Sequence, residues 1–164
     1  HRFNPEYERR YGVNGKFNVS WVTFKRTLSG LQCLERWASQ CREWCFYRNE
    51  DGKFGDQKYL DHWSQTYPGQ VCEIANPGAG LAPWNQMNYL IALQTDWQQV
   101  CVAEQVNGQA PPLWTPLVFY HYHQYVYRTR RSLHAISHDV EHLIYRPYDK
   151  AMERAHADLS LVRS

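Results

Sequence analysis

Hydrophobic and polar residues follow two different periods along this chain, and the change between them predicts both strands and helices. β-branched and aromatic residues dominate Phe17–Phe24 (FNVSWVTF), which is typical of a strand. Apolar positions then recur at helical spacing from Ser29 to about Tyr47, and Gln32 stands three residues after Ser29 as in a capping box. A proline and two glycines interrupt residues 1–16, which are therefore expected to be irregular.

The rest of the chain alternates shorter elements with turn signals. Asn49–Gly52 interrupts the first helix, Asn107-Gly108 is typical of a tight hairpin, and Pro147 predicts a break in the helical tail. This order predicts an α/β class with a mixed sheet. The further elements expected are a helix over Asp56–Gln65 that ends at Pro68-Gly69, strands over Val71–Ala75, Val100–Val106 and Pro116–Tyr125, a loop over Asn76–Asn85 and a helical tail from about Arg130.

Composition narrows the classes of function. The chain has 164 residues, a formal net charge of +2 and 21% charged residues. This length suits one domain, and so small a charge argues against nucleic-acid binding driven by phosphate neutralisation. No apolar run approaches the roughly 18 residues of a membrane-spanning helix. The sequence begins at His1 rather than at methionine, so we expect a processed chain or a piece of a longer one.

An odd number of cysteines, five, argues against a disulfide framework. Cys33, Cys41 and Cys45 are spaced so that a helix places them near one face, and no His or Cys pair completes a zinc signature around them. They are expected to be small buried side chains in a reducing compartment. The five are Cys33, Cys41, Cys45, Cys72 and Cys101.

Asp56, Gln57 and Lys58 bring a carboxylate, an amide and an ammonium together beside Gly55. Such a group can hydrogen-bond sugar hydroxyls and balance the charge of a phosphate, and Asn18 in the predicted strand adds an amide. The alternative is that Asp56 caps the free N–H groups at the start of the predicted helix. Both interpretations remain open on the residues alone.

Gly78, Ala79 and Gly80 precede Trp84 and Asn85 in the loop rich in glycine and proline. Small residues let a ligand approach the backbone, and the indole of Trp84 can pack on a sugar face. The alternative is an ordinary tight loop closed by a core tryptophan.

His121 and His123 stand two residues apart in a predicted strand, so they lie on one face with Phe119. One imidazole can bind a metal while the other orients a ligand, although a pair of strand histidines is more often structural. The sequence contains no DxD pair of carboxylates that would complete a divalent-metal site.

Basic and histidine residues also cluster near the tail. His134, His138 and His142 recur every four residues and point away from the apolar face of the same predicted helix, so we expect a solvated stripe rather than a metal site. That apolar face comprises Leu133, Ile136, Val140, Leu143 and Ile144. Three arginines precede the helix and are expected to be solvated, with contact to anionic lipid or phosphate as the alternative: Arg128, Arg130 and Arg131.

Four motifs in this order resemble one known family. They are FNVSWVTF (17–24), GKFGDQKYLDHW (52–63), NPGAGLAPWN (76–85) and PLVFYHYH (116–123). Together they look like the second half of bacterial GT-A-fold glycosyltransferases of the glycogenin-like, galactosyltransferase-like retaining group, from His1 to about Tyr125. The resemblance implies an α/β, mixed-sheet nucleotide-diphospho-sugar transferase fold. Residues 1–125 would form its acceptor-side part and residues 126–164 a C-terminal helical tail.

The resemblance also implies roles for particular residues. Asp56 and Gln57 fall on an Asp-Gln pair beside the anomeric carbon of the donor sugar and are implied to be catalytic. His121 falls on a histidine that helps to hold a divalent cation, Mn²⁺ or Mg²⁺, and the diphosphate. Gly80 and Gln124 depart from the amide and the glycine expected at their positions. With Lys58, whose ammonium can balance phosphate charge, the substrate-binding residues expected are Asn18, Gly78, Ala79, Trp84 and Asn85.

The implied reaction transfers a sugar from a nucleotide-diphospho-sugar to a hydroxyl of a glycan or lipid-linked acceptor, with retention, in bacterial glycan or polysaccharide synthesis. Nucleic acid is not an expected partner, and the expected location is the cytoplasm or the periphery of the inner membrane. In the family, the preceding half supplies the nucleotide-binding βαβ units and the DxD carboxylates. The chain alone is therefore expected to be inactive.

Two other hypotheses remain open. The abundance of tryptophan and tyrosine also suits a non-catalytic carbohydrate-binding module, which would hold a free glycan without metal or nucleotide. The chain could also be a structural piece with no activity of its own.

Overall fold

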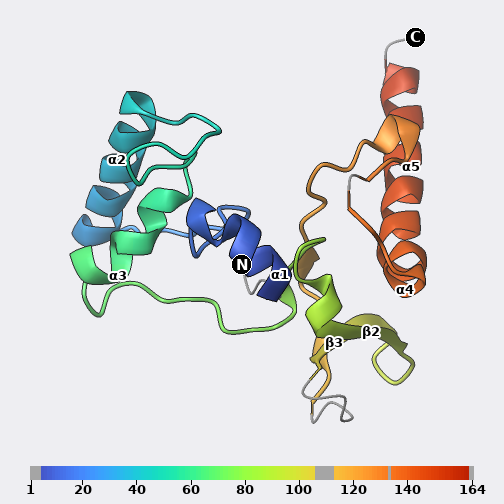
Figure 1. Cartoon of the computed structure of the whole chain (residues 1–164). Helices are drawn as coiled ribbons and strands as arrows, with labels where there is room; N and C mark the ends of the chain where they lie inside the picture. Colours follow the sequence, from blue (N-terminus) through green and yellow to red (C-terminus); the bar gives the residue numbers. More distant parts are fainter. Residues whose placement is uncertain (1–4, 106–112, 133, 163–164) are drawn as a thin grey trace. The chain divides into compact units, whose positions relative to one another are not determined.

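The computed structural model describes residues 5–105, 113–132 and 134–162, and the chain divides into two compact units, His1–Ala75 and Asn76–Ser164 (Figure 1). The described residues are mixed α/β with small sheets, and the strands all belong to the second unit. The functional division expected between residues 125 and 126 falls inside that unit and stays a prediction.

The described part of the first unit begins with a helix where an irregular segment was expected, so that prediction is wrong over residues 5–11. Helix α1 (Pro5–Tyr11) is followed by the 3₁₀ turn η1 (Gly12–Asn14). Proline is tolerated in the first turn of a helix, where an N–H has no intrahelical acceptor. Acidic residues in the first turn and basic residues in the last complement the helix dipole: Glu6, Glu8, Arg9 and Arg10.

Phe17–Phe24 is not a strand, contrary to its β-branched and aromatic composition. The side-chain oxygen of Asn18 accepts the backbone N–H of Ser20 at 2.8 Å, and this Asx turn interrupts the extended run. No strand pairs with the segment among the described residues. A segment with strand propensity forms a strand only where a second strand completes its backbone hydrogen bonds, and the described residues supply no such strand beside Phe17–Phe24.

Helix α2 (Leu28–Glu43) confirms the expected helix but shifts both of its ends. The cap is Thr27, whose hydroxyl accepts the N–H of Gly30 at 3.3 Å, so the capping box from Ser29 is wrong. The helix ends before Trp44, which is extended. The hydroxyl of Tyr59 satisfies the exposed acceptors there, because it lies 2.8 Å from the carbonyl oxygen of Trp44.

The turn expected at Asn49–Gly52 is present, with an isolated bridge between Glu50 and Lys53. The helix expected over Asp56–Gln65 is found as the 3₁₀ turn η2 (Lys58–His62) followed by α3 (Trp63–Thr66). The strand expected over Val71–Ala75 is wrong, because this segment has no pairing partner in the described chain.

The second unit contains two small sheets, one parallel and one antiparallel. Strand β1 (Ala79–Leu81) pairs with β5 (Phe119–Tyr120) in parallel. An antiparallel sheet runs in the order β2–β3–β4, and its strands are Tyr89–Gln94, Gln99–Glu104 and Thr115–Pro116. The strand expected from Val100 is confirmed up to Glu104, whereas β2 was not predicted. The expected turn at Asn107-Gly108 lies outside the described residues.

The tail helix begins at His138 rather than at about Arg130. The hydroxyl of Ser137 caps α4 (His138–Val140), which continues through a π-helical turn (Glu141–Tyr145) into α5 (Arg146–Val162). The break expected at Pro147 is wrong. The π turn just before it changes the hydrogen-bond pattern, which is one way in which a helix accommodates a proline.

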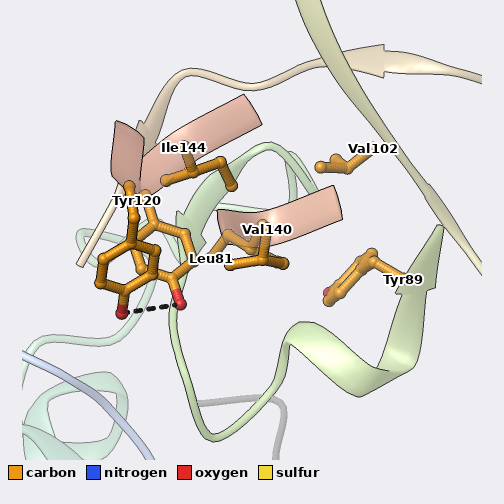
Figure 2. Packing of buried hydrophobic residues seen from close by; sticks show 7 residues of the cluster. Leu81, Tyr89, Val102, Tyr120, Val140 and Ile144 are labelled. Carbon is orange, nitrogen blue, oxygen red and sulfur yellow. Dashed lines mark hydrogen bonds between the residues drawn. The ribbon is translucent and has the colours of Figure 1, made fainter. Parts of the chain in front are cut away.

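The core of the second unit joins β1, β2, β3 and β5 to the tail helices (Figure 2). The expected apolar face of the tail is confirmed at Val140 and Ile144, and Leu133 lies outside the described residues. The core residues are Leu81, Tyr89, Val102, Tyr120, Val140, Ile144 and Tyr145. Within the described ranges, no helix combines the length and the apolar composition needed to cross a lipid bilayer.

Candidate functional site

Asp56 is a half-buried residue whose carboxylate is left available by its surroundings. Its backbone carbonyl accepts the indole N–H of Trp37 on α2 at 2.9 Å. Within the part of the chain that the structure describes, its carboxylate makes no hydrogen bond or ion pair. It does not cap the following turn either, because the cap position of η2 is Gln57 and no side chain bonds there. The capping alternative for Asp56 is therefore wrong.

Gln57 and Lys58, by contrast, are bound within the first unit. The amide of Gln57 donates to the carbonyl oxygen of Asn14 at 3.1 Å. The ammonium of Lys58 lies 3.0 Å from the carboxylate of Asp61, which also accepts the backbone N–H of Lys16 at 2.7 Å. These bonds tie η2 to the segment after α1. In this arrangement both side chains stabilise the unit around Asp56.

Asn18 does not join this group through its hydrogen bond, which serves its own turn as described above. The trio and Asn18 all belong to the first unit, whereas the loop residues and His121 belong to the second. The predicted site residues therefore fall into two sets, one in each unit.

In the second unit, Gly78 and Asn85 hold the loop together. A Cβ at Gly78 would lie 2.0 Å from the carbonyl oxygen of Pro116, so glycine is required by the close approach of the chain itself. Asn85 is 4% exposed; its side chain accepts the N–H of Ala82 at 2.8 Å and donates to the carbonyl of Gly80 at 3.2 Å. The loop is thus braced internally, with Ala79 at the start of β1.

Trp84 is 7% exposed and packs against two imidazoles. Its ring centroid lies 5.2 Å from that of His121 and 5.1 Å from that of His123. An indole covered in this way offers no open face, so stacking of a sugar on Trp84 does not fit this conformation. Its contacts make it a support for the two histidines.

His121 and His123 share one face, as the strand pattern predicted, although β5 itself ends at Tyr120. Their rings are stacked with centroids 5.7 Å apart, while Tyr120 and Tyr122 pack on Tyr145 in the core. Burial lowers the pKa of both imidazoles and thereby favours the neutral form, which is the form that binds a metal. No group of three or more His, Cys, Asp or Glu side chains within the described ranges is arranged to hold a metal ion.

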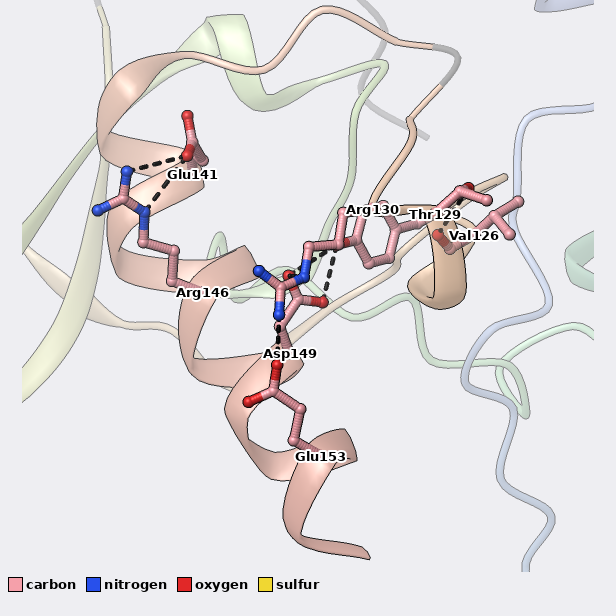
Figure 3. Close-up of polar contacts among 8 residues, drawn as sticks. Val126, Thr129, Arg130, Glu141, Arg146, Asp149 and Glu153 are labelled. Carbon is pink, nitrogen blue, oxygen red and sulfur yellow. Dashed lines mark hydrogen bonds and ion pairs between the residues drawn. The ribbon is translucent and has the colours of Figure 1, made fainter. Parts of the chain in front are cut away.

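The histidine stripe is confirmed only in part. His138 and His142 are exposed, with centroids 6.1 Å apart on the tail helix. His134 precedes the helix and packs against His123 at 5.5 Å. All three arginines of the cluster are exposed, as expected, and Arg130 also pairs with Asp149 at 3.8 Å and with Glu153 (Figure 3).

All five cysteines are free thiols, as their odd number indicated. Cys33 and Cys101 are buried as expected, whereas Cys45 and Cys72 are exposed and contradict the expectation of burial.

The contact that sequence reasoning missed is that between Trp37 and Asp56. Trp37 lies on α2, and its ring centroid is 5.7 Å from that of Trp63 and 6.1 Å from that of Phe24. The available signal was the indole N–H, because a tryptophan in a packed site normally finds an acceptor. Spacing in the sequence does not show which carbonyl that acceptor is.

Comparison with known proteins finds two relatives. No protein-family model matches the sequence, and no solved structure matches it significantly. In Bacillus subtilis (strain 168), the uncharacterized protein YfnF is 33% identical over 111 residues and the uncharacterized protein YfnD is 28% identical over 134 residues. These alignments cover 68% and 80% of this chain. They cover 33% and 39% of the relatives, so the chain spans between about a third and two fifths of their lengths.

Proposed function

We propose that this chain is the acceptor-side part of a retaining glycosyltransferase of the GT-A type, which transfers a sugar from a nucleotide-diphospho-sugar to an acceptor hydroxyl. The order of the four motifs supports the proposal. The observation that carries it is the half-buried carboxylate of Asp56, which lacks a hydrogen bond or ion pair in the described chain. A carboxylate in that state gains from accepting sugar hydroxyls or from facing a developing positive charge.

In this reaction Asp56 would act at the donor sugar. As the bond to the diphosphate breaks, positive charge grows at the anomeric carbon, and a fixed carboxylate stabilises it. Gln57 would orient the sugar, and its bond to Asn14 already fixes the amide. Lys58 would contribute positive charge near the substrate while its ammonium remains paired with Asp61.

His121 fits the role of one cation ligand, because burial favours its neutral form. A divalent cation, Mn²⁺ or Mg²⁺, would neutralise charge on the leaving diphosphate. The other ligands would be carboxylates outside this chain, since the described residues bring no sufficient group together. Trp84, Gly78, Ala79 and Asn85 would shape the substrate side by holding the loop and the imidazoles in place.

The acceptor would be a glycan or a lipid-linked saccharide in bacterial polysaccharide synthesis, and the protein would work in the cytoplasm or at the periphery of the inner membrane. The alternative, a non-catalytic carbohydrate-binding module, loses one of its supports. The aromatic residue of the glycine-rich loop, Trp84, is covered by two imidazoles and offers no open face for stacking.

The test uses the longest natural chain that contains this sequence. UDP-glucose, UDP-galactose and GDP-mannose are supplied in turn with MnCl₂, and release of nucleoside diphosphate is measured. Asp56→Asn is expected to lower turnover by about 100-fold or more. The matched control is Asp96→Asn, on the exposed turn between β2 and β3, which should leave turnover unchanged. Near-normal turnover by Asp56→Asn, or no turnover of any nucleotide-sugar, contradicts the proposal. Binding of a free glycan without nucleotide or metal would favour the module.

A further inference from the structure

The segment around Asp56 is fastened to helix α2 at two points. Trp37 donates its indole N–H to the carbonyl oxygen of Asp56 at 2.9 Å. Three residues later, the hydroxyl of Tyr59 lies 2.8 Å from the carbonyl oxygen of Trp44 and 3.3 Å from that of Gln40. The backbone from Asp56 to Tyr59 is therefore held against the second half of α2.

The ring of Trp37 has little freedom to move. Trp63 meets it edge-on, with centroids 5.7 Å apart and planes at 84°, and Phe24 lies on it at 6.1 Å. Both neighbours are half-buried side chains of the same unit. An indole packed in this way presents its N–H in a fixed direction, as a rigid donor does.

The carboxylate of Asp56 depends on this anchor because it has no hydrogen bond of its own within the described chain. Its position is set by the backbone that carries it, and the Trp37 bond is the direct side-chain constraint on that backbone. A group that stabilises a transition state must be held to within about 0.5 Å, and a displacement of about 1 Å can cost 100-fold in rate.

We propose that Trp37 is a positioning residue that holds the carboxylate of Asp56 through its indole N–H. This inference rests on the proposed role of Asp56 in sugar transfer. Trp37 itself touches no substrate in this account. It acts through the carbonyl of Asp56, so its loss should slow the reaction more than it weakens binding of the donor.

The experiment compares Trp37→Phe, Trp63→Phe and Asp56→Asn in the natural chain. Each variant is assayed with the nucleotide-sugar that the wild type turns over. Trp37→Phe keeps an aromatic ring and removes the N–H. Trp63→Phe is the matched control, because its ring packs in the same cluster and its indole makes no hydrogen bond in the described chain. Trp37→Phe is expected to lower kcat about 10- to 100-fold with KM for the donor changed less than about threefold, while Trp63→Phe keeps kcat within about threefold.

Equal losses of kcat in Trp37→Phe and Trp63→Phe would overturn the positioning role and leave the function intact. Full turnover in Asp56→Asn, by contrast, would overturn the proposed function and this inference with it. If Trp37→Phe does not fold, the indole N–H signals of the wild type decide the matter by NMR. Adding the donor must shift the Trp37 signal more than that of the exposed Trp97, and equal shifts would overturn the proposal.

Discussion

The hydroxyl of Tyr125 lies 2.7 and 2.9 Å from the two carboxylate oxygens of Asp149, which is itself only 8% exposed. Arg130 approaches the same carboxylate at 3.8 Å (Figure 3). The three residues join the segment after β5 to helix α5. A buried carboxylate needs such partners, because an unpaired one would lose its hydration without replacement.

Tyr125→Phe should therefore destabilise the protein by about 2 kcal/mol, since it removes a hydrogen bond to a charged and buried acceptor. The midpoint of urea unfolding, followed by circular dichroism, measures the change. Tyr127→Phe is the control, because the hydroxyl of Tyr127 makes no hydrogen bond in the described chain. Equal stability of the two variants would show that the pair with Asp149 adds nothing.

Gly78→Ala should be destabilising by about 1–3 kcal/mol, because its Cβ would stand 2.0 Å from the carbonyl oxygen of Pro116. The backbone carbonyl cannot move away without disturbing the approach to β5. Gly52→Ala is the comparison, since a Cβ there meets nothing within 4 Å and only the positive φ of 71° is strained. Thermal unfolding should rank Gly78→Ala as the less stable variant, and the reverse order would refute the crowding argument.

Thr27→Ala should cost about 1 kcal/mol, because Thr27 caps α2 through the N–H of Gly30. Ser29→Ala should cost less, since Ser29 lies inside the helix and makes only a 3.4 Å contact with the Thr27 hydroxyl. The free energies of unfolding of both variants, measured by chemical denaturation, show whether Thr27 or Ser29 caps α2. A larger loss in Ser29→Ala would restore the capping box expected from the sequence.

The thiol of Cys41 should resist alkylation. Burial, with the neighbouring Cys45 and Asp56, raises the pKa of Cys41 to about 11, so about one molecule in a thousand carries the reactive thiolate at pH 8. Because the pKa of Cys41 in the folded protein lies above the assay pH, the rate of Cys41 alkylation should rise roughly tenfold for each unit of pH up to about 10. Peptide mapping after iodoacetamide treatment should find the exposed Cys72 labelled well before Cys41. Labelling of both at the same rate would contradict the burial of Cys41.

Sequence patterns predict those elements whose stability is local. Helix α2 and the turn at Asn49–Gly52 follow from spacing and turn residues near in sequence. Phe17–Phe24 fails because a strand needs a partner that composition does not supply. Strand β1 was hidden in a glycine-rich loop, since its partner β5 comes almost 40 residues later.

The candidate site shows the same limit. Residue types singled out Asp56 and His121. Only the structure shows that the carboxylate of Asp56 has no hydrogen bond or ion pair among the described residues, whereas the side chains of Gln57 and Lys58 are bound. The pair of Lys58 with Asp61 is local, because the two residues lie three positions apart in η2, and sequence spacing is compatible with it. The indole bond from Trp37 to the carbonyl of Asp56 depends on how the chain turns after α2, and sequence spacing carries no information about it.

The π-helical turn gives the tail two helical phases. Val140 and Ile144 are buried four residues apart, and so are Tyr145 and Asp149, but Val140 and Tyr145 are separated by five. One residue in an α-helix corresponds to about 100° of rotation. The extra residue in this turn therefore sets the direction in which the side chains of α5 point. Removing it would restore a regular helix and rotate Asp149 away from Tyr125 by about 100°, even though every core side chain before it stayed in place.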